Sequence, residues 1–355
     1  MNNIIRNDII EIVSDNSIPW ERFRNKSVLI TGATGMLPIY MLYTFLYLNE
    51  QYNYQIKIYA LVRNKDRALD LLSEYKNQIT LLVQDVSSPI KLDDPINYIV
   101  HAASQASPKY YSIDPVGTIN ANVLGTINTL NLAREQSDFQ GYLYFSSGEI
   151  YGVVSPEYFP FNEDVYGYID LLRVRTCYCE SKRMGEQLCI AYKTQYSIPI
   201  HIVRIFHTYG PVMKLDDRRV FTDFVSNIVN NEDIVLKTKG EAERMFCYVT
   251  DAIRAYFLVL LCGTYDAYNV TNIQERVSIY SLAERLINLY PEKELKLKIQ
   301  IDPSDKVTNE NKSPIEVRVP NTSRISSLGW YPKITIEEGF KRVIDYQKLN
   351  YDKNI

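Results

Sequence analysis

The sequence has few of the residues that build disulfide frameworks or zinc sites. It contains five cysteines and three histidines among 355 residues. The closest cysteine pair, Cys177 and Cys179, has the spacing C-x-C rather than C-x-x-C, and the histidines lie far apart. An odd number of cysteines without metal-ligand spacing argues against structural disulfides and against bound zinc. We therefore expect no metal site.

A long hydrophobic run and a strong excess of one charge are also missing. The longest apolar run, residues 255–262, is too short to cross a bilayer. The amino-terminal isoleucines are interrupted by Arg6, Asp8 and Glu11, so they do not form the apolar stretch of a secretory leader. The net charge of −3, with both signs spread along the chain, provides no basic stripe for nucleic acid or an anionic membrane. We expect a cytoplasmic protein whose partner is a small ligand, with neither nucleic acid nor membrane as a partner.

What the sequence does contain is a regular alternation of short apolar runs and helical stretches over roughly its first two hundred residues. This alternation predicts an α/β fold with a doubly wound, parallel, Rossmann-type sheet. The expected strands are 27–31, 56–62, 79–83, 97–103, 142–147 and 200–206, and the expected helices are 36–49, 65–75, 115–136 and 178–195.

After about residue 207 the pattern becomes irregular, with one further helical segment near 279–290. No linker rich in proline or glycine separates this part from the sheet. We therefore expect a smaller, interleaved C-terminal substrate-binding cap. The predicted division is an amino-terminal helical extension at 1–25, a dinucleotide-binding domain at 26–206 and 245–275, and a cap at 207–244 and 276–355.

The first strand runs into "ITGATGMLPIY", residues 30–40. Gly32 and Gly35 between a strand and a helix suit a pyrophosphate, because glycines allow a tight turn and the helix N-terminus attracts anions. A third glycine is missing, and Pro38 falls in the first helical turn, where proline is tolerated. A plain turn is the alternative interpretation.

The second strand ends in "ALVRN", where an NAD site usually has an acidic residue. Arg63 at this position suits a 2′-phosphate, so we favour NADP slightly over NAD. Asp85, after the third strand, is a candidate for the adenine edge. A solvated basic turn and a solvated loop acid are the respective alternatives.

The segment "TCYCESK" places Tyr178 and Lys182 four residues apart on a predicted helix, so both side chains face the same way. A nearby ammonium favours phenolate, and we expect it to lower the pKa of the tyrosine toward that of a general base. Upstream, "YFSSGEIYG" places Ser146, Ser147 and Glu149 just beyond a strand, where ligand sites of α/β folds occur. With 29 tyrosines, a chance Y-x-x-x-K pair is the alternative.

These motifs, in this order, resemble the extended short-chain dehydrogenase/reductases, the NAD-dependent epimerase/dehydratase family of nucleotide-sugar enzymes. The resemblance covers residues 26–346. Within the family, the sequence is most similar to the UDP-glucuronate decarboxylase branch. It rests on "TGATG", "HAASQASPKYY", "NVLGTINTL", "FSSGEIYG", "CYCESKRMGE", "RIFHTYGP", "RVFTDF", "ERMFCYVTDA", "YNVTN" and "LGWYPK".

The resemblance implies roles for individual residues. Tyr178 would be the base that removes a proton from a sugar hydroxyl, usually at C4, assisted by Lys182, Ser147 and Glu149. The cofactor-binding residues would be Gly32, Thr34, Gly35, Met36, Leu37, Arg63, Asp85, Val86, Ala102, Ala103, Ser104, Asn122, Tyr178 and Lys182. The substrate-binding residues would be Ser107, Lys109, Ser147, Gly148, Glu149, His207, Arg219, Arg244 and Arg318.

The family's reactions share one oxidation and then diverge. Dehydratases carry Asp-Glu where this chain has Gly148-Glu149, which disfavours dehydration. Decarboxylases keep the glutamate and an arginine matching Arg244, although that arginine suits a diphosphate equally well. His207 replaces the family's asparagine, and Arg218 replaces a glycine beside Arg219.

We expect an enzyme that oxidises a nucleotide-diphosphate sugar at C4 and returns the hydride, as an epimerase or decarboxylase does. The first alternative is an NADPH-dependent reductase of a 4-keto nucleotide sugar, which Arg63 favours. The second is a non-catalytic nucleotide-binding protein. The resemblance also implies a homodimer formed through the helices at 115–136 and 178–195.

Overall fold

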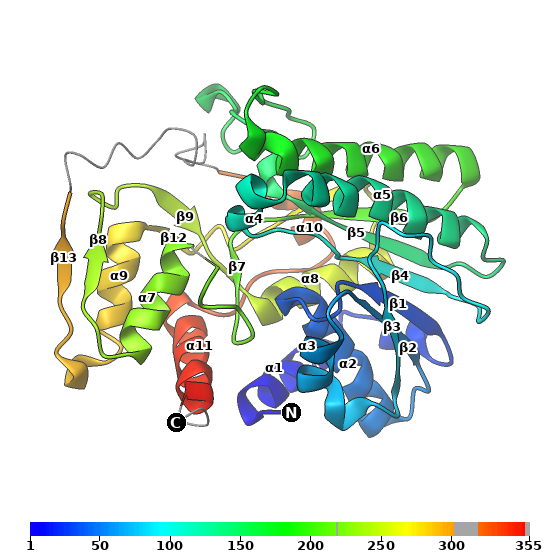
Figure 1. The fold of residues 1–355 in the computed structure, drawn as a ribbon, viewed down its shortest axis with the longest axis horizontal. Helices are drawn as coiled ribbons and strands as arrows, with labels where there is room; N and C mark the ends of the chain where they lie inside the picture. The colour runs from blue at the N-terminus through cyan, green and yellow to red at the C-terminus, as the bar shows by residue number, and fades with distance from the viewer. Residues whose placement is uncertain (218, 302–318, 352–355) are drawn as a thin grey trace.

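The computed structural model describes residues 1–217, 219–301 and 319–351. Its centre is a seven-stranded sheet in the order β11-β6-β5-β4-β1-β2-β3, and every neighbouring pair is parallel (Figure 1). This order confirms the predicted doubly wound sheet. The strands are β1 (Ser27–Thr31), β2 (Lys57–Val62), β3 (Ile79–Val83), β4 (Tyr98–His101), β5 (Gly141–Ser147), β6 (Ile200–Ile205) and β11 (Ala267–Val270).

Helices cover both faces of the sheet. On one face lie α5 (Pro115–Arg134) and α6 (Cys177–Tyr196), and on the other lie α1 (Asn3–Val13), α2 (Met36–Tyr52) and α8 (Val249–Cys262) (Figure 1). Helix α3 (Lys65–Leu72) connects β2 to β3, and the short α4 (Pro108–Ile113) follows β4. The four helices expected between the strands begin and end within about three residues of their predicted bounds.

The sequence interpretation missed helix α8 and strand β11. Helix α8 contains the apolar run at 255–262, and its residues from Val249 to Leu261 are all buried. It packs against β5 and β6 on one side and against α1 and α2 on the other. Since α8 is buried along nearly its whole length, its sequence shows a short apolar run, which does not by itself distinguish a buried helix from a buried strand.

The irregular carboxyl-terminal part forms a smaller group of helices and two-stranded sheets. Helices α7 (Val220–Val229), α9 (Ile279–Ile287) and α11 (Ile336–Tyr351) pack together, to the left of the main sheet in Figure 1. Beside them β8 (Ile234–Leu236) pairs with β13 (Leu297–Ile299), and β9 (Glu243–Met245) pairs with β12 (Arg276–Ser278). Strands β7 (Thr208–Tyr209) and β10 (Cys247–Tyr248) pair in parallel. Helix α10 (Ser323–Ser326) lies near β11.

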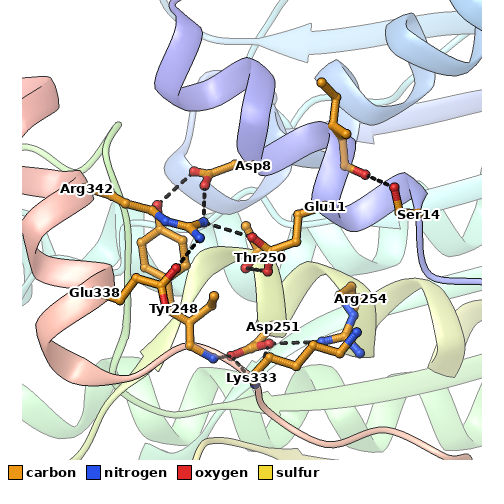
Figure 2. Close-up of polar contacts among 12 residues, drawn as sticks. Asp8, Glu11, Ser14, Tyr248, Thr250, Asp251, Arg254, Lys333, Glu338 and Arg342 are labelled. Atoms are coloured by element: carbon orange, nitrogen blue, oxygen red, sulfur yellow. Dashed lines mark hydrogen bonds and ion pairs between the residues drawn. The ribbon is translucent and has the colours of Figure 1, made fainter.

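The amino-terminal helix α1 is held by a buried carboxylate (Figure 2). Asp8 is fully buried, and its Oδ2 accepts hydrogen bonds from the phenols of Tyr40 in α2 (2.7 Å) and Tyr248 in β10 (2.8 Å). Its Oδ1 accepts a hydrogen bond from Arg342 of α11 at 2.7 Å. Burial raises the pKa of Asp8, while the phenols and the guanidinium oppose this shift. One side chain thus connects the start of the chain to α2 and to the carboxyl-terminal helix.

A second buried carboxylate lies one turn along α8 from this group (Figure 2). Asp251 accepts hydrogen bonds from the backbone N–H groups of Lys333 and Ile334 and from Arg254, which also binds Asp15. Burial raises the pKa of Asp251 to about 6, against the effect of these donors. This carboxylate secures the segment that leads into α11.

Candidate active site

The glycine loop brings the end of β1 into close contact with the segment that follows β4. Gly32 has φ +63°, and a Cβ placed on it would lie 2.8 Å from Cα of Ala103. Gly35 donates its N–H to the carbonyl of Gly32 at 2.8 Å and is the N-cap of α2, which begins at Met36. Pro38 is the third residue of that helix, so its predicted place in the first turn is confirmed. The loop therefore has the shape and the helix N-terminus that an anionic phosphate requires.

The segment after β4 is fixed by one hydroxyl at the end of β1. Thr31 Oγ1 accepts the N–H groups of Ala102 (3.1 Å) and Ala103 (3.0 Å), and it also contacts His101 Nδ1 at 2.8 Å. Burial lowers the pKa of His101 to about 3, so the ring is neutral at physiological pH. The carboxyl ends of two adjacent parallel strands are thus held together.

Several buried polar atoms beside this segment have no partner in the part of the chain that the structure describes. They include Oγ of Ser104 and Oδ1 of Asn122, although Nδ2 of Asn122 donates to Ser181 at 2.9 Å. A buried acceptor or hydroxyl without a partner is costly, so such atoms indicate a place where a polar ligand binds. Ser104 and Asn122 are both among the predicted cofactor-binding residues.

Tyr178 lies in the first turn of α6 and is buried, with 7% of its surface exposed. Its ring stacks on that of Tyr111 in α4, with centroids 4.8 Å apart and planes 17° apart. Burial raises the pKa of Tyr178 to about 12, although a hydrogen bond with Ser147 lowers it. Ser147 ends β5, so the structure brings together the two hydroxyls that the sequence predicts as neighbours.

Lys182 shares the buried face of α6 with Tyr178, as their spacing predicts. Its Nζ donates to the carbonyl of Phe145 at 2.6 Å and lies 5.0 Å from the ring centroid of Tyr144. Burial lowers the pKa of this lysine to about 7. The expectation that the ammonium would lower the tyrosine's pKa is therefore corrected, because burial dominates both groups and the shift of Tyr178 is upward.

Glu149 and Arg175 form an ion pair beside these hydroxyls. Nη1 of Arg175 lies 3.2 Å from Oε2 of Glu149, and the side chains are 15% and 23% exposed. The backbone N–H of Glu149 donates to Oγ of Ser147 at 3.1 Å. The sequence interpretation gave no role to Arg175, although its position three residues before Tyr178 was a usable signal.

Comparison with known proteins agrees with this geometry. The family model of the NAD-dependent epimerase/dehydratase family matches residues 28–271, more than half of the chain. The chain belongs to this family. The enzyme is 31% identical over 317 residues to UDP-glucuronic acid decarboxylase 6 of Arabidopsis thaliana, with 89% of this chain and 87% of that protein covered. The resemblance read from the motifs is thus confirmed.

Solved structures share the fold of this epimerase/dehydratase-family enzyme at low sequence identity. An epimerase from Methanothermobacter thermautotrophicus has a TM-score of 0.77 at 18% identity, covering 99% of this chain and 97% of its own. UDP-glucuronic acid 4-epimerase from Bacillus cereus in complex with NAD has a TM-score of 0.74 at 20% identity, covering 92% and 99%. These likenesses establish the architecture.

In this family member, Arg63 at the end of β2 is exposed toward solvent. Its Nη1 lies 3.9 Å from Oδ2 of Asp85, and the two side chains are 62% and 42% exposed. Burial raises the pKa of Asp85, but hydrogen bonds from Ser87 and the charge of Arg63 outweigh burial, so the pKa is lowered overall. Arg67 reaches back to the glycine loop and donates to the carbonyl of Thr34 at 3.3 Å. Two cations thus flank the loop on the β2 side.

Of the remaining predicted cofactor residues, Met36 and Leu37 form the first turn of α2, and Val86 is buried after β3. Val86 Cγ1 lies 2.8 Å from where a Cβ on Gly125 of α5 would be. These residues lie at the carboxyl ends of the strands, where ligands of α/β folds bind.

On the substrate side, α4 is tied to the segment before α7. Oγ of Ser107 donates to the carbonyl of Asp217 at 3.3 Å, and Nζ of Lys109 binds Asp216 at 2.8 Å. Arg219 pairs with Asp217 at 2.5 Å, and its Nε is buried without a hydrogen-bond partner in the described chain. The positive charge of Arg219 also lowers the pKa of Tyr178. Three of the predicted substrate residues therefore contact the same short segment, Asp216 and Asp217.

The other predicted substrate residues are more dispersed. The ring of His207 lies 5.9 Å from that of Phe246, and Arg244 on β9 donates to the carbonyl of Glu243 at 2.8 Å. A Cβ on Gly148 would lie 2.5 Å from Cε1 of Phe206, so this position has no room for a larger side chain. Arg318 and Arg218 lie outside the described residues.

Two general features complete the description. In the described part of the chain, no helix combines the length and apolarity needed to span a membrane. Nor does that part place three or more histidine, cysteine or acidic side chains where they could hold a metal ion.

Proposed function

We propose that this enzyme oxidises a nucleotide-diphosphate sugar at C4 and returns the hydride in the same cycle, as an epimerase or a decarboxylase. The observation that carries the proposal is the placement of Ser147, the last residue of β5, beside the phenol of Tyr178 in the first turn of α6. This pair lies at the carboxyl edge of the sheet that carries the glycine loop. In this role Ser147 holds the reacting sugar oxygen while Tyr178 removes its proton.

The cofactor is proposed to be a nicotinamide dinucleotide, which accepts and returns the hydride of C4. Gly32 and Ala103 pack closely without a side chain between them, so a pyrophosphate can come close to the backbone of the loop. The first turn of α2 supplies N–H donors for it. The unpartnered oxygens of Ser104 and Asn122 fit the polar groups of such a molecule. Lys182 is proposed to donate to the nicotinamide ribose in addition to the carbonyl of Phe145.

Decarboxylation is the branch that sequence similarity favours, because the relative at 31% identity is named as a UDP-glucuronic acid decarboxylase. Oxidation of C4 to a ketone would make the C5 carboxylate a β-keto acid, which loses carbon dioxide readily. We propose Glu149 and Arg244 as the acidic and basic residues that serve this step. Dehydration is disfavoured, because the aspartate that dehydratases use at position 148 would collide with Phe206.

A second candidate is reduction of a 4-keto nucleotide sugar by NADPH. It is favoured by one observation, the exposed guanidinium of Arg63 at the end of β2, which suits a 2′-phosphate. In this reaction Tyr178 donates its proton to the sugar oxygen, and its raised pKa suits an acid. The preference between NADP and NAD is therefore part of the proposal.

We further propose a cytoplasmic homodimer joined through α5 and α6. These helices expose large apolar side chains: Val116, Ile119 and Leu124 on α5 and Met184 on α6. Exposed apolar groups on adjacent helices favour association with another protein surface. Sedimentation analysis distinguishes the dimer from a monomer.

The parts of the chain at 207–244 and 276–355 are proposed as the substrate-binding cap.

The test is mass spectrometry of reaction mixtures containing UDP-glucuronic acid, other nucleotide sugars or their 4-keto forms. Loss of carbon dioxide without added cofactor supports the decarboxylase, and unchanged mass with altered retention supports the epimerase. A gain of two hydrogens that requires added NADPH supports the reductase. Unchanged sugars throughout the panel would contradict an enzymatic role in nucleotide-sugar conversion.

A further inference from the structure

The ion pair of Arg175 and Glu149 belongs to a series of contacts that begins and ends at Tyr178. Starting from the phenol, the series passes through Ser147 to the backbone N–H of Glu149 and on to the carboxylate of that residue. Arg175 continues the series, 3.2 Å from the carboxylate and with its guanidinium carbon 5.8 Å from the ring centroid of Tyr111. The ring of Tyr111 then stacks on Tyr178.

Arg175 is well placed to hold its neighbours because its own backbone is fixed. It lies in a single 3₁₀ turn, Val174–Thr176, directly before α6. The hydroxyl of Thr176 donates to the carbonyls of Asp170 (2.9 Å) and Arg173 (2.6 Å), which closes this turn. The guanidinium is therefore presented from the element that also carries Tyr178.

Tyr111 is fixed in a comparable way. It is 4% exposed, and its hydroxyl donates to the carbonyl of Ala106 at 2.9 Å. The thiol of Cys177 contacts its backbone carbonyl at 3.8 Å. A buried ring held at both ends offers Tyr178 a rigid flat surface, so the stack restricts the plane of the catalytic ring.

We propose that Arg175 is a positioning residue, which holds the carboxylate of Glu149 and, through Tyr111, fixes the ring of Tyr178. The proposal rests on the function assigned to Tyr178 above. Arg175 also offsets the negative charge of Glu149, which otherwise disfavours ionisation of the phenol. The other charged or titratable groups that face this phenol are Arg219, Cys179, Tyr111 and Tyr144.

The first test is Arg175→Gln, measured with UDP-glucuronic acid. We expect kcat to fall by about 10- to 100-fold, because a misplaced general base loses part of its effect. The acidic limb of the pH profile should move upward by about one pH unit, since Glu149 is then not neutralised. KM should stay within about twofold, because the change acts on the chemical step. Arg175→Lys should restore part of kcat.

The chain provides a matched control in a similar trio on its surface. Arg24 pairs with Glu21 at 2.7 Å and lies 4.3 Å from the ring centroid of Tyr54, but this group lies at the other end of the sheet. Arg24→Gln should leave both kcat and the pH profile unchanged. Equal losses in the two variants would overturn the positioning role of Arg175.

A second measurement does not depend on turnover. The ring resonance of Tyr178 in tyrosine-labelled protein is assigned as the signal missing from Tyr178→Phe. We expect this signal to move in Arg175→Gln and in Tyr111→Leu. In Tyr111→Phe, which keeps the stacked ring, it should lie closer to the wild-type position than in Tyr111→Leu. In Arg24→Gln it should not move. An unmoved signal in Arg175→Gln overturns the inference, whereas full activity of Tyr178→Phe overturns the proposed function instead.

Discussion

Two regions of this enzyme combine an arginine, a carboxylate and tyrosines, and they differ in how completely these groups satisfy one another. Around Asp8, both carboxylate oxygens are occupied, by Tyr248 and Arg342 (Figure 2) and by Tyr40. The carboxylate is fully buried. Around Tyr178, the ion pair of Glu149 remains partly exposed. The same chemical groups thus form a closed network in one place and an open one in the other.

The difference indicates why we propose the region around Tyr178, rather than the region around Asp8, as a site. A closed network has no polar atom left for a ligand, so its contribution is to hold α1, α2 and α11 together. In the candidate site, Ser104, Asn122 and Arg219 each retain a buried polar atom without a hydrogen-bond partner in the described chain. A buried polar atom without a partner costs free energy. A ligand that forms a hydrogen bond with it removes this cost, which favours binding. Substitutions can test this contrast between stability and chemistry.

The largest expected effect is on chemistry at the open network. Tyr178→Phe removes the proton-transferring hydroxyl and keeps the stacked ring, so turnover should fall by about 10³-fold or more. Mass spectrometry of the products measures this loss, and nucleotide affinity measured by calorimetry should be retained. Turnover equal to that of the wild type would remove Tyr178 from the catalytic role.

The closed network should give a large effect on stability instead. Asp8→Ala leaves two buried phenols without their acceptor and removes one of the three carboxylates that Arg342 binds, so the free energy of unfolding should fall by about 3 kcal/mol. Denaturant unfolding measures the change, and kcat per folded molecule should remain close to wild type. A kcat that falls as much as in Tyr178→Phe would show that the two networks are not separate in function.

The buried carboxylate of Asp251 should make stability depend on pH. Its pKa is raised from 3.8 to about 6 by burial, so its stabilising contribution is complete below its unfolded pKa and is lost as the pH rises through about 6. From about pH 4 to pH 7 this group should lower the free energy of unfolding by about 2 kcal/mol. In Asp251→Asn, denaturant titrations across this range should lose that slope. An unchanged slope would assign the pH dependence to other groups.

The smallest expected effect concerns the cofactor. Arg63→Asp replaces an exposed cation with an acid that suits ribose hydroxyls, so the ratio of NADP to NAD affinity should fall by about tenfold. Fluorescence titration with both dinucleotides measures this ratio, with Arg24→Gln as the control for a surface arginine. A ratio that does not change would assign Arg63 to its ion pair with Asp85 alone.

Much of the fold was predictable because the sheet strands are continuous apolar runs. The bounds of β1 and β3 match their predictions, since each run is flanked by polar or glycine residues. Helix α8 was missed, because a short apolar run does not by itself distinguish a buried helix from a buried strand. The regular alternation of strands and helices therefore identified the elements of the first two hundred residues better than those of the irregular part that follows.

The candidate site was predictable in its members but less so in its electrostatics. The motif spacing correctly brought Ser147 and Tyr178 together, yet it could not show how deeply the phenol is buried. The expected fall in its pKa was therefore wrong in sign. The role of Asp8 was also hidden, because the sequence shows a charge among isoleucines and does not show that it meets Arg342, far along the chain.

The bond between Asp8 and Arg342 also bears on how the protein is made. During synthesis Asp8 and Tyr40 leave the ribosome long before Arg342 has been added, so α1 lacks a cationic partner for most of translation. We expect the amino-terminal helix to dock stably only when nearly the whole chain has emerged. A nascent chain halted before position 342 would therefore carry an uncompensated carboxylate against apolar surface, a state that chaperones and proteases can recognise.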